Sequence, residues 1–293
     1  MNVISISKKK FAELMPLTLA KEIMNAESTI YDFPYRKERK VFKKIHNLSG
    51  PVLTTKLDTI EMLDTYREYL PESFCVPDNL VAIDQTISGF TVPFVEGENL
   101  ASVLADPNVS IKKQINYLKQ IGKILDQLKQ MRKSTPVNGL YLNDLHEFNF
   151  IVDFKSETIR VVDLDSCKIG SNLPMSSRYL VPTALVADAQ GKYKRNTNPG
   201  ASGYIVADEN SDLYCYNIMI LNYLYGSSVN NMGLTDFYDY LTYLSEIGME
   251  PDLINSFRML LHSCDNRNPA PELDSITKEQ FLLAKKKVYR QAR

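Results

Sequence analysis

Residues 143–166 have the sequence NDLHEFNFIVDFKSETIRVVDLDS and hold the strongest local pattern in the chain. Two β-prone runs, 148–153 and 158–165, flank the polar link 154–157. Short runs of β-branched and aromatic residues around a polar link are typical of a tight β-hairpin. A hairpin brings its two outer ends together, so residues just before the first strand and at the end of the second should lie close to one another.

Three polar residues occupy those outer positions. Asp144 lies just before the first run, Asn149 lies at its start, and Asp163 lies near the end of the second. Phosphoryl transfer requires a carboxylate that orients the attacking hydroxyl and oxygen ligands that hold Mg²⁺ against nucleotide phosphates. The spacing therefore predicts a site for this chemistry at one end of the hairpin.

In this stretch the chain resembles the protein-kinase-like superfamily, whose catalytic loop has the pattern D-x-x-x-x-N and whose metal-binding motif begins with Asp. The resemblance implies that Asp144 is the catalytic base, that Asn149 binds Mg²⁺ and that Asp163 is the main Mg²⁺ ligand. It also implies that ATP is the phosphate donor.

The run KVFKKI, residues 40–45, resembles the strand that carries the phosphate-anchoring lysine of this superfamily. Strand alternation puts Val41 and Lys43 on one face, toward the cofactor. Lys43 is the predicted anchor and Lys44 the alternative, because a slip of one residue exchanges the faces.

The partner of this lysine should lie on the following helix, which the apolar spacing predicts over residues 54–70. Glu61 has the residue type and about the spacing that the resemblance implies, and it is the predicted partner in the cofactor site. Asp58 fits the apolar phase of the helix slightly better and stays an alternative.

The run GFTVPFVEGENL, residues 89–100, resembles the segment that joins the two lobes in this superfamily, with the backbone of Pro93 and Val95 facing an adenine. The expected fold is α+β: a small β-rich lobe over 1–95, a hinge over 96–98 and a larger, mainly helical lobe over 99–293.

Within these lobes, hairpins are expected over 28–45 and 79–95, and a long helix is expected to start at an N-cap, Ser110. The segment from Ser166 to about Asn210 has weak periodicity and should be irregular. The chain from Ser211 onward should be helical.

Two later residues match structural positions of the superfamily. The stretch NSDLYCYNIMILNYLYG, residues 210–226, resembles the helix whose buried Asp supports the catalytic loop, which would be Asp212. Near the C-terminus, Arg267 matches the buried structural arginine.

The chain also departs from the pattern. The expected glycine-rich loop, residues 25–33, contains no glycine, and Leu142-Asn143 stands in place of the His-Arg pair. His146 gives the sequence Asp-Leu-His, which also occurs in aminoglycoside- and choline-type phosphotransferases; it would contact the γ-phosphate or hydrogen-bond the loop. Asp165 replaces the glycine of the metal motif, where it would bind a second Mg²⁺ or cap the loop.

Composition restricts the classes of function. The 293 residues include 34 basic and 35 acidic side chains, a net charge of -1, so no global charge favours nucleic acid or an anionic membrane. No secretory signal or membrane span is expected, and the four cysteines lack zinc or disulfide spacing. These features favour a cytoplasmic protein.

We therefore expect an ATP- and Mg²⁺-dependent phosphotransferase, with a Ser/Thr hydroxyl of a protein as the acceptor. One alternative is a small-molecule kinase, because Asp-Leu-His is present and no peptide-docking motif is recognised. The other is a pseudokinase that binds nucleotide or a partner, because the glycines and the His-Arg pair are missing. The sequence leaves the oligomeric state open.

Overall fold

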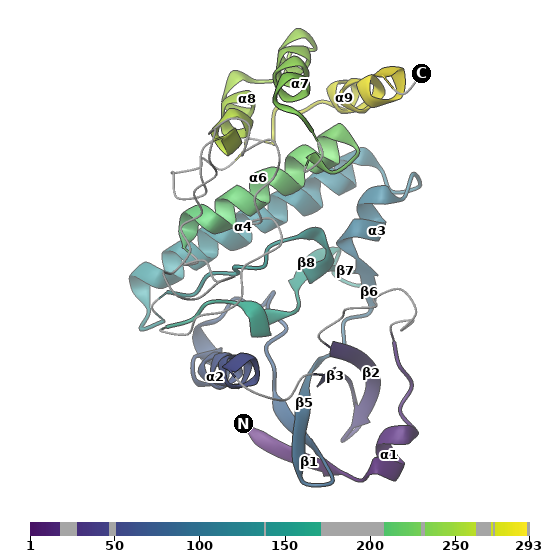
Figure 1. Cartoon of the computed structure of the whole chain (residues 1–293), viewed down its shortest axis with the longest axis vertical. Coiled ribbons are helices and arrows are strands. Elements are labelled where there is room, and N and C mark those ends of the chain that lie inside the picture. The colour runs from purple at the N-terminus through teal and green to yellow at the C-terminus, as the bar shows by residue number, and fades with distance from the viewer. Residues whose placement is uncertain are drawn as a thin grey trace.

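A computed structural model describes residues 1–17, 28–46, 51–137, 139–170, 208–229, 232–261, 271 and 273–291. The described residues form a mixed α+β structure with an N-terminal five-stranded sheet and a mainly helical C-terminal region (Figure 1). The expected α+β class is confirmed, and the arrangement is compatible with two lobes.

The N-terminal sheet has the strand order β1-β4-β5-β3-β2. Its strands are β1 (Asn2–Ile6), β2 (Ser28–Tyr35), β3 (Glu38–Ile45), β4 (Asn79–Ile83) and β5 (Thr86–Pro93). Both expected hairpins are confirmed, and each turns through two residues with positive φ, Arg36-Lys37 and Asp84-Gln85. Such turns match the right-handed twist of the flanking strands. Strand β1, which was not predicted, pairs in parallel with β4.

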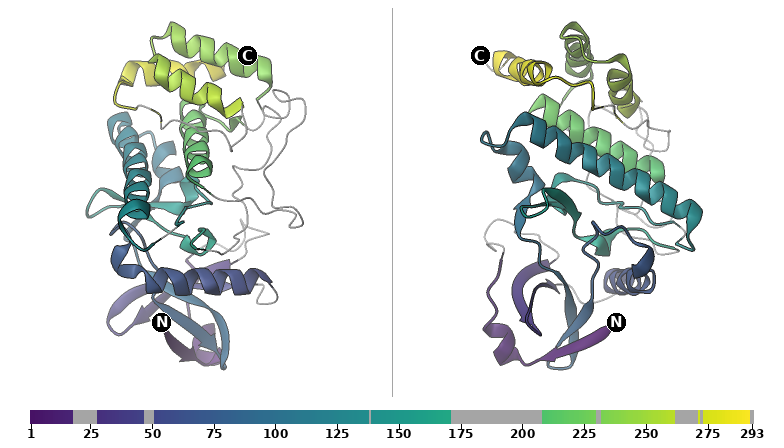
Figure 2. Two further views of the ribbon diagram at one scale, coloured as in Figure 1. Left: turned by 90° about the vertical axis from the view of Figure 1, so that its left-hand side faces the viewer. Right: turned by 180° about the vertical axis from the view of Figure 1, so that it is seen from behind.

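The two faces of this sheet carry different apolar clusters. On one face Phe42 packs with Ile4, Phe33 and Val81, and the short helix α1 (Lys8–Ala12), also not predicted, adds Phe11. On the other face Ile45 and Phe90 pack with Ile60 of α2 (Pro51–Thr65). Helix α2 therefore covers the face from which odd-numbered residues of β3 project, and it lies between the sheet and the helical region (Figure 2).

A second, three-stranded sheet has the order β6-β7-β8 and contains the hairpin predicted from residues 143–166. Its strands are β6 (Gly97–Asn99), β7 (Phe150–Asp153) and β8 (Thr158–Val161). The predicted hinge residues 96–98 overlap β6, so this part of the connection is itself a strand that pairs with β7. Helix α3 (Leu100–Ala105) follows directly.

The C-terminal region is built on two long neighbouring helices, α4 (Ile111–Ser134) and α6 (Glu209–Tyr225) (Figure 1). The predicted N-cap is confirmed, since the Ser110 side chain accepts a hydrogen bond from Lys113 N. Buried Tyr216 of α6 donates its hydroxyl to the Leu118 carbonyl of α4 at 2.8 Å. The remaining helices are α7 (Leu234–Glu246), α8 (Pro251–Arg258) and α9 (Lys278–Gln291). None of the helices in the described ranges has the length and apolarity needed to cross a membrane.

Candidate functional site

Asp144 and Asn149 lie together in the loop that leads into β7. The Asn149 amide nitrogen donates to the backbone oxygen of Asp144 at 2.8 Å and to its carboxylate Oδ2 at 3.3 Å. Asn149 ends a short 3-10 turn, η2 (Glu147–Asn149), and is buried. Because the amide nitrogen faces Asp144, the carboxamide oxygen of Asn149 is the atom left for a ligand.

The hairpin brings Asp163 to the same end, as the spacing predicts. Val162 N donates to the Asn149 carbonyl at 2.9 Å, which sets the residue before Asp163 beside Asn149. Asp163 itself has a left-handed backbone with φ 63°, and the chain then turns into η3 (Leu164–Ser166). Asp and Asn adopt this conformation more readily than other non-glycine residues, so residue type and backbone shape agree at the turn.

Asp212 of α6 hydrogen-bonds the backbone just before Asp144, in agreement with the role that the resemblance implies. Its carboxylate accepts hydrogen bonds from Leu142 N at 2.9 Å and Asn143 N at 2.8 Å. The side chain of Asn143 in turn donates to the Ser166 carbonyl at 3.0 Å, which links the loop to the end of η3. Burial, opposed by the two backbone hydrogen bonds, raises the pKa of Asp212 to about 7.

His146 contacts the loop itself. Its Nδ1 accepts a hydrogen bond from Phe148 N at 3.2 Å, and its Nε2 lies 3.4 Å from Asp144 Oδ2. An acceptor Nδ1 leaves the proton on Nε2 of a neutral imidazole, facing the carboxylate. These contacts favour the loop-bonding role over a contact with the γ-phosphate.

Lys43 of β3 reaches the end of the hairpin where Asp163 lies, and Lys44 does not. The Lys43 ammonium contacts Asp163 Oδ1 and lies 2.7 Å from Asp165 Oδ1. Lys44 projects to the opposite face, where its ammonium lies 5.8 Å from the centre of the Phe11 ring. Burial disfavours the charged form of Lys43, but the two carboxylates outweigh it and hold the pKa of Lys43 above its usual value. Val41 shares the Lys43 face and pairs with Val92 of β5.

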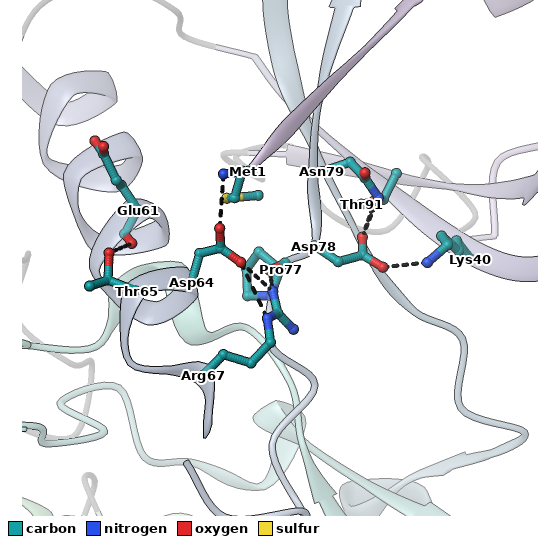
Figure 3. A network of polar contacts seen from close by, with 10 residues as sticks. All are labelled: Met1, Lys40, Glu61, Asp64, Thr65, Arg67, Pro77, Asp78, Asn79 and Thr91. Atoms are coloured by element: carbon teal, nitrogen blue, oxygen red, sulfur yellow. Dashed lines mark hydrogen bonds and ion pairs between the residues drawn. The ribbon is translucent and has the colours of Figure 1, made fainter. Parts of the chain in front are cut away.

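The predicted partner of Lys43 on α2 is wrong. Glu61 and the alternative Asp58 are both exposed, and in Figure 3 the Glu61 carboxylate points away from the other side chains drawn. A buried lysine of α2, Lys56, contacts the site instead, with its ammonium 2.7 Å from Asp165 Oδ2. The reason is the rotation of α2 about its own axis, which places Lys56 on the buried face and Asp58 and Glu61 on the exposed face.

The buried face of α2 includes Lys56 and the residues four and seven positions after it. Lys56, Ile60 and Leu63 are all buried, and this spacing is one stripe of an α-helix. A lysine in phase with a buried apolar stripe is the feature of the sequence that could have identified Lys56.

Asp165 is predicted either to bind a second Mg²⁺ or to cap the loop, and in the structure its carboxylate pairs with two lysines. Its side chain is fully buried, with Lys43 on one carboxylate oxygen and Lys56 on the other. Burial alone would raise the pKa of Asp165, but the two lysine charges hold it far below its usual range. In contrast, burial raises the pKa of Asp163 to about 6, against the charge of Lys43. Asp165 is therefore an anchor for two lysines in this conformation.

The predicted adenine-facing segment begins at the last residue of β5. Pro93 is exposed and pairs with Lys40, while Val95 is half-buried between β5 and β6. Lys40 is buried, and its ammonium contacts the Asp78 carboxylate, which also accepts from Thr91 (Figure 3). This polar network links β3 to β5 near the C-terminal end of β5. The contact of Pro93 and Val95 with adenine stays a prediction.

Several predicted features lie outside the described residues: Ala26 and Glu27 of the glycine-free loop, residues 171–207 of the irregular segment, and Arg267. Compared with known proteins, the chain matches no family model and, at a significant level, no curated sequence. The geometry of the site therefore carries the functional argument.

Proposed function

We propose that this protein is an ATP- and Mg²⁺-dependent phosphotransferase of the protein-kinase-like superfamily that acts on a hydroxyl group. One observation carries the proposal: Asp144, Asn149 and Asp163 meet at one end of the β7–β8 hairpin, and Lys43 reaches the same point from β3. Phosphoryl transfer depends on positioning and charge neutralisation, which this combination of groups provides.

The residues present fit the implied cofactor. Mg²⁺ prefers oxygen ligands and is usually held by one or two protein groups together with phosphates and water. Asp163 offers a carboxylate and Asn149 a carboxamide oxygen. Among the described residues no group of three or more His, Cys, Asp or Glu side chains forms a metal site, so a metal here would depend on the nucleotide for further ligands.

Each residue of the site has a distinct task under this proposal. Asp144 accepts the proton of the attacking hydroxyl, and Asn149 and His146 hold its carboxylate in place. Lys43 would exchange Asp163 for a phosphate oxygen, since both are anionic partners for one ammonium group. Bound Mg²⁺ would neutralise the phosphate charge that grows during transfer.

The proposal is tested by thermal stability in buffer, with ATP, and with ATP plus Mg²⁺, for the wild type and Asp163→Asn. Ligand at about 100 times its Kd adds about 2.7 kcal/mol of stability, which raises Tm by several degrees for a chain of this size. We expect a Mg²⁺-dependent rise that Asp163→Asn loses. No rise at millimolar ATP would contradict the proposal.

The favoured acceptor is a Ser or Thr hydroxyl of a protein, because the Asp212 contacts belong to the helical lobe of protein kinases more than to small-molecule phosphotransferases. Radiolabel transfer from ATP to a protein panel and to a metabolite and antibiotic panel separates the two classes of acceptor. Transfer to small molecules alone would favour the small-molecule kinase.

A nucleotide-binding pseudokinase is the second candidate. The observation that favours it is the direct pairing of Lys43 with Asp163, because both groups must change partners before a Mg²⁺–nucleotide complex fits. It predicts the same Tm rise with ATP but no radiolabel transfer to any acceptor, even at high protein concentration.

A further inference from the structure

Four charged side chains alternate in sign at the base of the site, and three of them are largely buried while Asp163, at the end of the series, is 34% exposed. Asp163 contacts Lys43, Lys43 bridges to Asp165, and Asp165 contacts Lys56. The side chain of Asp165 is fully buried, and those of Lys43 and Lys56 are 13% and 9% exposed. Two positive and two negative groups balance one another in this cluster.

Such a cluster is sensitive to the loss of one member. A buried ion that loses its partner leaves an uncompensated charge, which is far more costly than the loss of an exposed pair. Asp165 is the most buried of the four and has one ammonium on each oxygen. Lys56 is therefore the partner that keeps Asp165 neutralised whenever Lys43 turns to another anion.

We infer that Lys56 is a positioning residue of this site: it ties α2 to the turn that carries Asp163, and it retains Asp165 so that Lys43 is released to bind an anionic phosphate. This inference rests on the proposed function for the nature of the anion. The sequence-based prediction pairs Lys43 of β3 directly with an acid of α2. In the structure Lys43 pairs with Asp165, on the turn that carries Asp163, and Asp165 pairs in turn with Lys56 of α2.

Two other roles for Lys56 predict different results when it is removed. If Lys56 bound the phosphates directly, removing it would lower nucleotide affinity whatever residue stood at position 165. If Lys56 only filled space in the core, its removal would lower stability and leave the affinity of the folded protein unchanged. The inference predicts that the effect of Lys56 on affinity depends on the Asp165 carboxylate.

A double-mutant cycle tests this dependence with Lys56→Met, Asp165→Asn and the double variant, and with Lys112→Met as a control for loss of an exposed lysine on α4. The Kd of ATP with Mg²⁺ is measured by calorimetry. We expect Lys56→Met to raise Kd about tenfold, a coupling of the size common between neighbouring residues. In the double variant Lys43 is no longer held by a carboxylate at position 165, so Kd should return close to the wild-type value.

The result that would overturn the inference is a Kd of the double variant as high as that of Lys56→Met, or an unchanged Kd in Lys56→Met. An affinity loss found only in Glu61→Gln would also overturn it, because the acid on the outer face of α2 would then be the working partner.

Tm without nucleotide gives a second readout that is independent of the proposed function. Lys56→Met should melt several degrees below the wild type, and the double variant should regain at least half of that loss because the buried carboxylate that lost one of its two ammonium partners is then absent. Additive losses would contradict the pairing. If the wild type binds no nucleotide, the proposed function fails, while these melting temperatures still decide whether Lys56 and Asp165 act as one unit.

Discussion

The buried carboxylate of Asp212 holds the backbone of the loop that leads into Asp144, and its removal gives a prediction with a calculable size. Asp212 is 3% exposed and accepts two backbone hydrogen bonds, from Leu142 N and Asn143 N. Asn143 has the left-handed φ of 59°, so these bonds hold an uncommon backbone conformation next to Asp144.

Asp212→Ala would leave both N–H groups buried without their acceptor. Each such loss costs about 1–3 kcal/mol, so the free energy of unfolding should fall by about 2–6 kcal/mol. Asp212→Asn keeps one acceptor oxygen and should lose about half as much. Urea unfolding followed by circular dichroism measures both values.

Asp252→Ala is the matched control, because Asp252 is an exposed acid in the first turn of α8. An exposed acid at that place gains stability from the helix dipole, which contributes about 0.3–1 kcal/mol. If Asp212→Ala costs no more than Asp252→Ala, Asp212 is an ordinary first-turn acid and the reasoning about the loop is refuted.

The pH dependence adds a check on the same residue. Burial raises the pKa of Asp212 to about 7 in the folded state, above the roughly 3.9 of an unfolded chain. The folded state then binds the proton more tightly, so the stability that Asp212 contributes is fully present below pH 4 and is lost as pH rises toward 7. The advantage of the wild type over Asp212→Asn should be smaller at pH 8 than at pH 5. An advantage that grows with pH would mean that the two N–H donors outweigh burial.

Three further predictions concern the site and its support. Asp144→Asn should lower phosphate transfer at least about 100-fold, the lower range for a general base, and keep the Tm rise with ATP and Mg²⁺; loss of both would contradict the assigned role. Gly89→Ala should destabilise the protein by about 1–3 kcal/mol, because a Cβ at this position would lie 2.0 Å from the Lys43 carbonyl oxygen; urea unfolding that matches the wild type would show that β3 and β5 are not so closely packed. Leu63→Ala, at a fully buried position of α2, should cost about 2–5 kcal/mol, and a much smaller loss in urea unfolding would mean that α2 is loosely docked.

The parts of the fold that local pattern determines were predictable from the sequence. The hairpins at 28–45, 79–95 and 143–166 have polar turns between alternating strands, and the N-cap Ser110 precedes a regular apolar stripe. Strand β1 was not, because its stability comes from pairing with β4, whose paired residues lie 77 positions later in the chain. Long-range pairing of a short strand leaves little trace in local periodicity.

The site was predictable where chain connectivity fixes proximity. Asp144, Asn149 and Asp163 belong to one hairpin, so the spacing alone brings them together. The partner of Lys43 depends on how α2 is rotated against the sheet, which the packing of Ile60 with Ile45 and Phe90 determines. The charged residues at 56, 58 and 61 do not by themselves show which of them faces the sheet. The spacing of Lys56 from the apolar residues Ile60 and Leu63 is needed to decide it.

The negative charge of Asp165 explains why the α2 residue that faces it is a lysine, Lys56, and not an acid. In the metal motif that residues 163–165 resemble, a glycine stands at the third position, and an acid on the helix then has one lysine to pair with. In this chain Asp165 adds a buried carboxylate, so an inward-facing acid on α2 would leave three carboxylates around the single ammonium of Lys43. Like charges at such distances in a buried site repel strongly. A lysine on α2 removes that conflict, which means that positions 56 and 165 must be interpreted together. Changing both in one variant is therefore a smaller perturbation than changing either alone.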